Sequence, residues 1–140
     1  MKRWVVITHM MVVSMLFPCK GMTQELIANA GLQVSEISRT QARLLFTMRL
    51  QQWPDDQPVK VFVLADTNPI HVNFAKRMLQ LFPYQLRRVW DRQVFSGTGQ
   101  APITVATEKE MIERVAATPG ALGYVNSAAS LSGVKQIAIY

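Results

Sequence analysis

The chain has 140 residues, of which 49% are hydrophobic, and its formal net charge is +6. This length suits one domain, and the hydrophobic share is enough to bury a core. The sequence holds a single cysteine, Cys19, so an internal disulfide scaffold is excluded. A positive net charge is typical of proteins that bind nucleic acids, but this prediction holds only if the charge lies in the folded domain.

The N-terminus has the pattern of an export signal. Lys2 and Arg3 precede an apolar run that ends before Pro18. The run is shorter than the roughly 20 apolar residues of a transmembrane helix, and it matches the apolar region of a signal peptide. We therefore predict a signal peptide at residues 1–21 and a periplasmic domain at residues 22–140. A buried N-terminal helix or an uncleaved anchor is the alternative.

Cleavage changes the charge and the chemistry of the mature chain. Residues 1–21 hold three of the 15 basic residues and none of the nine acidic ones, so the mature net charge is +3. Since export also removes the usual partner, we expect no nucleic-acid binding. Loss of Cys19 excludes cysteine nucleophiles, CxxC redox chemistry and thiolate zinc sites. Lipidation of Cys19 is the alternative, which Pro18 disfavours because a lipobox has a small residue there.

Strands and helices alternate along the rest of the chain. Residues 23–31 lack strong periodicity and indicate a helical turn or a linker. Apolar patterns predict strands at residues 32–37, 59–65, 103–106, 123–125 and 134–140. Helices are predicted at residues 38–50, 69–82, 84–94 and 108–117, with Ser38, Asn68 and Thr107 as caps. This order favours an α/β domain with a central, mostly parallel or mixed sheet between helices.

Three stretches resemble one protein family. Residues 110–125, EMIERVAATPGALGYV, place Thr-Pro-Gly after a helix and Gly-Tyr-Val on a buried strand. Residues 44–63, LLFTMRLQQWPDDQPVKVFV, and residues 90–102, WDRQVFSGTGQAP, add a weaker likeness. From about residue 34 onward the chain is similar to phosphate ABC-transporter substrate-binding proteins of the type II periplasmic binding-protein superfamily. The resemblance implies one three-layer periplasmic binding-protein-like lobe, because full members close two lobes on an anion.

The resemblance places anion contacts at the junction between the strand at residues 59–65 and the next helix. Thr67 and Asn68 are the candidate ligands there, since a helix N-terminus presents free N–H groups. Family members tend to carry Ser, Gly, Thr and a nearby Arg at this junction, whereas this chain has Asp66 and Pro69. Asp66 accepts a hydrogen bond from a protonated phosphate or repels a dianion. The alternative is that Thr67 and Asn68 only cap the helix.

A polar loop, Ser96-Gly97-Thr98, is the second candidate for binding phosphate or another oxyanion. Two hydroxyls and a flexible glycine can surround an oxyanion together with backbone N–H groups. The same residue types also serve a plain surface turn, which is the alternative. No GxxxxGK[ST] pattern is present, so a nucleotide P-loop is not expected.

The remaining polar residues form no catalytic constellation. His71 is the only histidine of the predicted mature chain and has no HExxH spacing. We therefore expect no enzyme activity, no metal and no cofactor; a small hydrolase would have only the hydroxyl loop in its favour. Basic residues at 76–77, 87–88 and 92 indicate a solvated face or a surface that steers anions.

These patterns predict an exported phosphate- or oxyanion-binding lobe without catalytic activity, linked to phosphate uptake or sensing. The alternative is an interaction module that keeps the lobe fold without a ligand. Such a module would dock on a membrane transporter, porin or sensor, or form a homo-oligomer, through apolar surface that a second lobe would otherwise cover.

Overall fold

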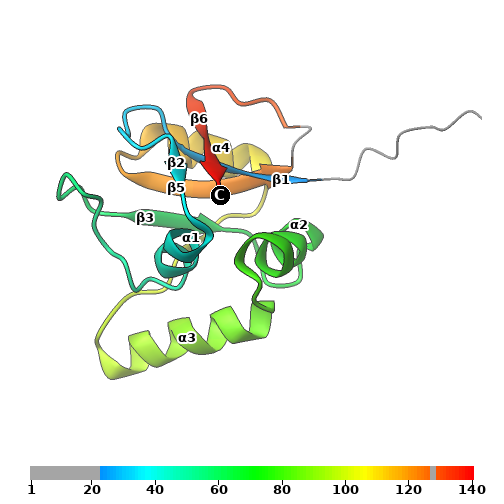
Figure 1. The fold of residues 1–140 in the computed structure, drawn as a ribbon. Helices are drawn as coiled ribbons and strands as arrows, with labels where there is room; N and C mark the ends of the chain where they lie inside the picture. Colours follow the sequence, from blue (N-terminus) through cyan, green and yellow to red (C-terminus); the bar gives the residue numbers. More distant parts are fainter. Residues whose placement is uncertain (1–22, 127–128) are drawn as a thin grey trace, which may run out of the picture.

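The computed structural model describes residues 23–126 and 129–140. Six strands form one sheet in the order β2-β6-β1-β5-β3-β4 (Figure 1). They are β1 Gln24–Asn29, β2 Glu36–Ile37, β3 Lys60–Val63, β4 Ile103–Thr104, β5 Ala121–Asn126 and β6 Val134–Ile139. β1 lies antiparallel between β5 and β6, whereas β3 runs parallel to β4 and β5, and β2 runs parallel to β6. The sheet is therefore mixed. The predicted signal peptide and the lipidation of Cys19 lie outside the described residues.

Helices cover both faces of this sheet (Figure 1). They are α1 Arg39–Phe46, α2 Pro69–Phe74 with its π-helical continuation η1 Ala75–Leu79, α3 Pro83–Ser96 and α4 Glu108–Ala117. Neighbouring residues of β5 show the two faces: a Cβ on Gly123 would meet Met111 of α4 at 2.6 Å, while Tyr124 stacks on Phe74 of α2. Since successive side chains of a strand point to opposite faces, α4 covers one face and α2 the other. The predicted three-layer α/β fold is confirmed.

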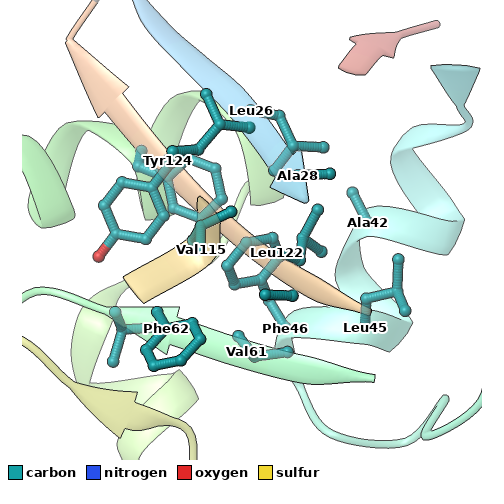
Figure 2. Packing of buried hydrophobic residues seen from close by; sticks show 14 of the residues in the cluster. Leu26, Ala28, Ala42, Leu45, Phe46, Val61, Phe62, Val115, Leu122 and Tyr124 are labelled. Carbon is teal, nitrogen blue, oxygen red and sulfur yellow. The ribbon is translucent and has the colours of Figure 1, made fainter. Parts of the chain in front are cut away.

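The core joins all three layers, with buried side chains from β1, β3, β5, α1 and α4 (Figure 2). Phe74 stacks on Tyr124 with ring centroids 3.9 Å apart, and Phe46 of α1 meets Phe74 edge-on at 4.7 Å. Both are favourable aromatic geometries. These three aromatic rings hold α1 and α2 against β5, the strand that was predicted from the Gly-Tyr-Val stretch.

α3 is attached to this core through two buried side chains and a few hydrogen bonds. Leu86 and Trp90 are its buried residues, and the Trp90 indole N–H donates to the carbonyl of Phe46 at 2.8 Å. The rest of α3 faces outward, at the margin of the molecule in Figure 1. Most of the polar side chains of α3 are therefore at least partly exposed to solvent.

The prediction for residues 23–31 is wrong, because residues 24–29 form β1 in the middle of the sheet. Because helices cover both faces of the sheet, this central strand is buried on both faces and does not show the alternation of a half-exposed strand. Its polar residues lie at its ends, with Leu26, Ile27 and Ala28 buried between them. Among the other elements, the predicted strand at 32–37 shortens to β2, and the helix predicted from residue 84 already begins at Pro83.

Candidate functional site

β3, β4 and β5 run in the same direction, so they end at one edge of the sheet, here called the carboxyl edge. Asp66 and Thr67 follow β3, and Thr107 follows β4. The backbone N–H of Asn126, the last residue of β5, donates to the carboxylate of Glu108 at the start of α4. In open α/β sheets, ligands bind outside this edge of the strands.

Thr67 and Asn68 lie at the carboxyl edge, as the resemblance implied. The Asn68 side chain accepts from the Ile70 N–H at 2.9 Å and thereby caps α2. Pro69 is the first residue of that helix and has no N–H to offer a ligand. Thr67 is exposed. The capping role of Asn68 is thus confirmed, while its role and that of Thr67 as anion ligands stay predictions.

The charged pair at this edge is Asp66 with Arg87 of α3. Arg87 donates from Nε to Asp66 Oδ2 and from Nη2 to Oδ1, both at 2.9 Å. Two parallel charge-assisted hydrogen bonds of this kind are strong and directional. The hydrogen bonds from Arg87 hold the pKa of Asp66 below its ordinary value, and Asp66 in turn raises the pKa of Arg87. No local pattern indicates that these two residues, 21 positions apart, are partners.

Behind this pair lies a buried polar chain. The Tyr124 hydroxyl oxygen accepts from the Leu64 N–H at 2.8 Å and lies 2.5 Å from His71 Nδ1. The hydroxyl proton finds an acceptor when it points to Nδ1, which places the imidazole proton on Nε2. Nε2 is buried without a hydrogen-bond partner among the described residues, 4.0 Å from Asp66 Oδ1.

Burial sets the protonation of this chain. His71 is fully buried, and desolvation lowers its pKa although Asp66 acts in the opposite direction. Desolvation also raises the pKa of Tyr124. Both groups are therefore neutral at pH 7. A neutral, buried imidazole hydrogen-bonded to a tyrosine positions α2 against β5 and β3, and it presents no base to a substrate.

Ser96, Gly97 and Thr98 lie elsewhere. The N–H groups of Gly97 and Thr98 donate to carbonyls of Val94 and Gln93 at the C-terminal end of α3, and Gly97 has the left-handed φ of +70°. These N–H groups are therefore occupied, and the negative end of a helix dipole disfavours an anion. The two hydroxyls are 2.8 Å apart and exposed. The anion role of this loop stays a prediction that rests on those hydroxyls.

The two candidate segments are at opposite ends of β3. Gly97 and Thr98 line a groove together with Pro58 and Lys60, which stand at the start of that strand. Thr67 and Asn68 follow its end. The structure therefore does not combine them into one site. Sequence order alone cannot show which end of a strand a loop some 30 residues later approaches.

Within residues 23–126 and 129–140, no three His, Cys, Asp or Glu side chains are grouped to hold a metal ion. The same part of the chain contains no helix long and apolar enough to cross a membrane. The basic residues predicted as one sector divide: Arg87 pairs with Asp66, while Arg88 and Arg92 line a groove described below.

No protein-family profile and no curated protein matches the sequence. Solved structures do match in fold. An ABC-type phosphate transport receptor from Vibrio cholerae superposes with a TM-score of 0.63 at 14% identity, over 84% of this chain and 46% of that one. A putative phosphate ABC-transporter substrate-binding protein with bound phosphate from Clostridium perfringens gives 0.67 at 15% identity, over 84% and 45%. PstS from Borrelia burgdorferi gives 0.65 at 12% identity, over 84% and 47%.

The chain spans less than half the length of each of these structures. Identities of this size show the fold and not the ligand. The predicted resemblance is confirmed at that level: the chain has the fold of one lobe of the phosphate ABC-transporter substrate-binding proteins.

Proposed function

We propose that the chain is an exported, non-catalytic lobe that binds phosphate or a similar small oxyanion at its carboxyl edge and serves phosphate uptake or sensing. The observation that carries the proposal is the fold shared with phosphate-binding receptors over 84% of the chain. The arrangement of Asp66, Thr67 and Arg87 at the carboxyl edge supports it.

The chemistry of that edge suits a protonated phosphate. Arg87 uses two of its five N–H groups on Asp66, so three are left to meet oxyanion oxygens. The exposed Thr67 hydroxyl adds a neutral donor. The Asp66 carboxylate can accept a hydrogen bond from the proton of hydrogen phosphate, which sulfate lacks at neutral pH. Phosphate is therefore expected to bind more tightly than sulfate.

A binding role agrees better with the polar groups than catalysis does. His71, the histidine of the described residues, is fully buried and its Nδ1 is occupied by Tyr124. A nucleophile needs a base within hydrogen-bond reach. The exposed hydroxyls of Ser96 and Thr98 bond to one another and not to a base.

Calorimetric titration of the purified chain with phosphate, and with sulfate as the control, tests the proposal at low salt. We expect saturable phosphate binding that weakens at least tenfold in Thr67→Val and Arg87→Gln. Ser96→Ala and Thr98→Ala examine the other candidate loop in the same assay. No saturation at millimolar phosphate would contradict autonomous phosphate capture.

The second candidate function is an interaction module without a ligand. Exposed apolar side chains at both ends of α3 favour it: Phe82 and Tyr84 are 50% and 60% exposed at its start, and Phe95 is 90% exposed at its end. Exposed patches of this kind mark association surfaces. Docking on a membrane transporter, porin or sensor, and association with a second copy, are the two forms of this candidate.

A further inference from the structure

A second polar feature of the molecule is a groove of about 500 Å³ between α3 and the connection from α1 to β3. Three arginines line it, namely Arg88 and Arg92 of α3 and Arg49 of the connection. Arg88 and Arg92 are four residues apart, so they share one face of the helix. Arg87 lies about 100° further round the helix, since a turn takes 3.6 residues, and it serves Asp66 instead.

No acidic side chain lines this groove. The lining contains no Asp or Glu, and the ion pairs within residues 23–126 and 129–140 all involve Asp66. Asp91, three residues after Arg88 on α3, forms no ion pair with Arg88 or Arg92. Like charges at this helical spacing repel one another, and this repulsion costs some helix stability. An anion bound between the arginines would remove that cost.

Neutral donors complete the lining. Gln85 accepts from the Phe82 N–H through its Oε1, so its amide NH₂ group is the part left to donate into the groove. Thr98 adds the hydroxyl of the polar loop. Guanidinium groups and amide donors match phosphate oxygens in geometry as well as charge.

We propose that this groove is a binding site for a ligand with linked phosphates, a diphosphate or triphosphate group, and that it is separate from the carboxyl edge. Its volume lies within the range of about 300–1,000 Å³ that holds small organic ligands, well above the need of one oxyanion. One turn of α3, about 5–6 Å, separates Arg88 from Arg92. Two linked phosphate groups of one ligand can contact both arginines, whereas a single phosphate group bridges this distance less well. The lining has no aromatic side chain to stack on a base, so the phosphate chain carries the recognition.

The experiment titrates the full-length chain with inorganic tripolyphosphate, adenosine triphosphate and inorganic phosphate at low salt. We expect saturable binding of both triphosphates with similar affinity. Phosphate that binds in this groove is recognised by its loss in Arg88→Gln, and the triphosphates should bind at least tenfold more tightly than that phosphate. Arg88→Gln and Arg92→Gln should each weaken triphosphate binding at least tenfold, and the double variant should abolish it. Arg77→Gln, which removes one exposed charge outside the groove, is the matched control.

Several outcomes would overturn the proposal. One is the absence of saturable binding at millimolar tripolyphosphate. Another is an equal loss in Arg77→Gln, which would show attraction by net charge only. A third is equally tight binding of a short polyglutamate, which would assign the groove to acidic peptides.

Arg49 and Arg92 also lie near helix C-termini, where cations stabilise the dipole. If their substitution lowers the melting temperature and leaves triphosphate binding intact, these two arginines serve the fold alone. Arg87→Gln should leave triphosphate binding unchanged, which separates this test from that of the carboxyl edge.

Discussion

The hydroxyl of Tyr124 connects β5 to two other elements, because it accepts from Leu64 after β3 and bonds to His71 of α2. Tyr124→Phe keeps the ring stacked on Phe74 and removes both hydrogen bonds. Leaving a buried polar group without its partner costs about 1–3 kcal/mol. We therefore expect Tyr124→Phe to lower the free energy of unfolding by about 2–6 kcal/mol in urea titrations, since two such groups are left.

Tyr84→Phe is the matched control for that experiment. Tyr84 is 60% exposed, and its ring stacks on Phe82. Loss of an exposed hydroxyl changes stability by less than about 0.5 kcal/mol. If Tyr124→Phe is as mild as Tyr84→Phe, the buried chain contributes no net stability and the structural role assigned to His71 is wrong.

The lowered pKa of His71 predicts how stability depends on pH. The unfolded chain binds a proton at His71 near pH 6.5, whereas burial delays protonation of the folded chain to lower pH. The unfolded state therefore gains more protons as the pH falls, so the free energy of unfolding decreases below pH 6.5 until the folded pKa is passed. The slope is at most about 1.4 kcal/mol per pH unit.

His71→Gln should remove that slope. The only other histidine of the sequence, His9, lies in the predicted signal peptide, so no other side chain of the mature chain has its ordinary pKa in this window. Urea unfolding of the mature form at pH 7, 6 and 5 compares the two proteins; the slope is the readout, because the variant is also expected to be less stable at pH 7. Parallel curves would show that His71 titrates with an ordinary pKa when folded.

Single residues differ in how well the sequence predicted their roles. Ser38 and Gln41 form the predicted capping box, with both hydrogen bonds present. Thr107 accepts from the Glu110 N–H as expected, but the Glu110 carboxylate reaches the Ala106 N–H and not that of the cap. Local spacing predicts such caps because both partners lie on one turn. It cannot predict the Asp66–Arg87 pair or the approach of Tyr124 to His71, which depend on how distant elements pack.

The connection from α4 to β5 is a tightly fitted turn of the sheet. Gly120 has a φ of +74°, and its carbonyl accepts from the Trp53 indole N–H and the Lys60 N–H. A Cβ at Gly120 would lie 2.2 Å from the carbonyl oxygen of Pro58. The Thr-Pro-Gly stretch therefore fixes β5 against the start of β3, and the glycine is required by a backbone contact as well as by its φ.

Gly97 and Gly120 provide a matched pair for this argument. Both have left-handed φ, but a Cβ at Gly97 would meet nothing within 4 Å. A non-glycine residue in this conformation costs about 1–2 kcal/mol. We expect Gly97→Ala to lose that amount, and Gly120→Ala to lose at least about 2 kcal/mol more because the backbone must move. Thermal and urea unfolding measure both; equal losses would show that the Pro58 contact yields without cost.

At the level of elements, the sequence predicted the helices better than the strands. Caps place the starts of α1, α2 and α4 within one residue, because these signals lie within one turn, whereas the predicted helix at residues 38–50 runs past the end of α1 at Phe46. β1 was missed because its apolar core is only three residues long and its pairing partners, β5 and β6, come about 100 residues later. The π-helical turns of η1 have no local signal either; η1 ends at Gln80, which has a left-handed φ of 54°.

For the whole molecule, the resemblance predicted the lobe fold and pointed to the junction after β3, and the structure adds which side chains lie at that junction. At the carboxyl edge Arg87 forms a bidentate pair with Asp66, and Thr67 is exposed beside it. The polar loop that resembled an oxyanion site lies at the other end of β3, next to the arginine groove. Folding thus separates the two anion candidates that the sequence left open.

The exposed end of α3 carries the last prediction, which concerns self-association. Phe95 is 90% exposed and the adjacent Val94 is 51% exposed, although burying each would gain about 1.5–3 kcal/mol. We expect the chain to dimerise at micromolar concentration through this end of α3, and Phe95→Ser to weaken the dimer at least tenfold without changing the melting temperature of the monomer. Sedimentation equilibrium measures both proteins, with Tyr140→Ser as control, since Tyr140 is 74% exposed and follows β6, away from α3 in the sequence. A monomer at all concentrations, or equal weakening by Tyr140→Ser, would leave this surface without a role in self-association and turn the search toward a different protein partner.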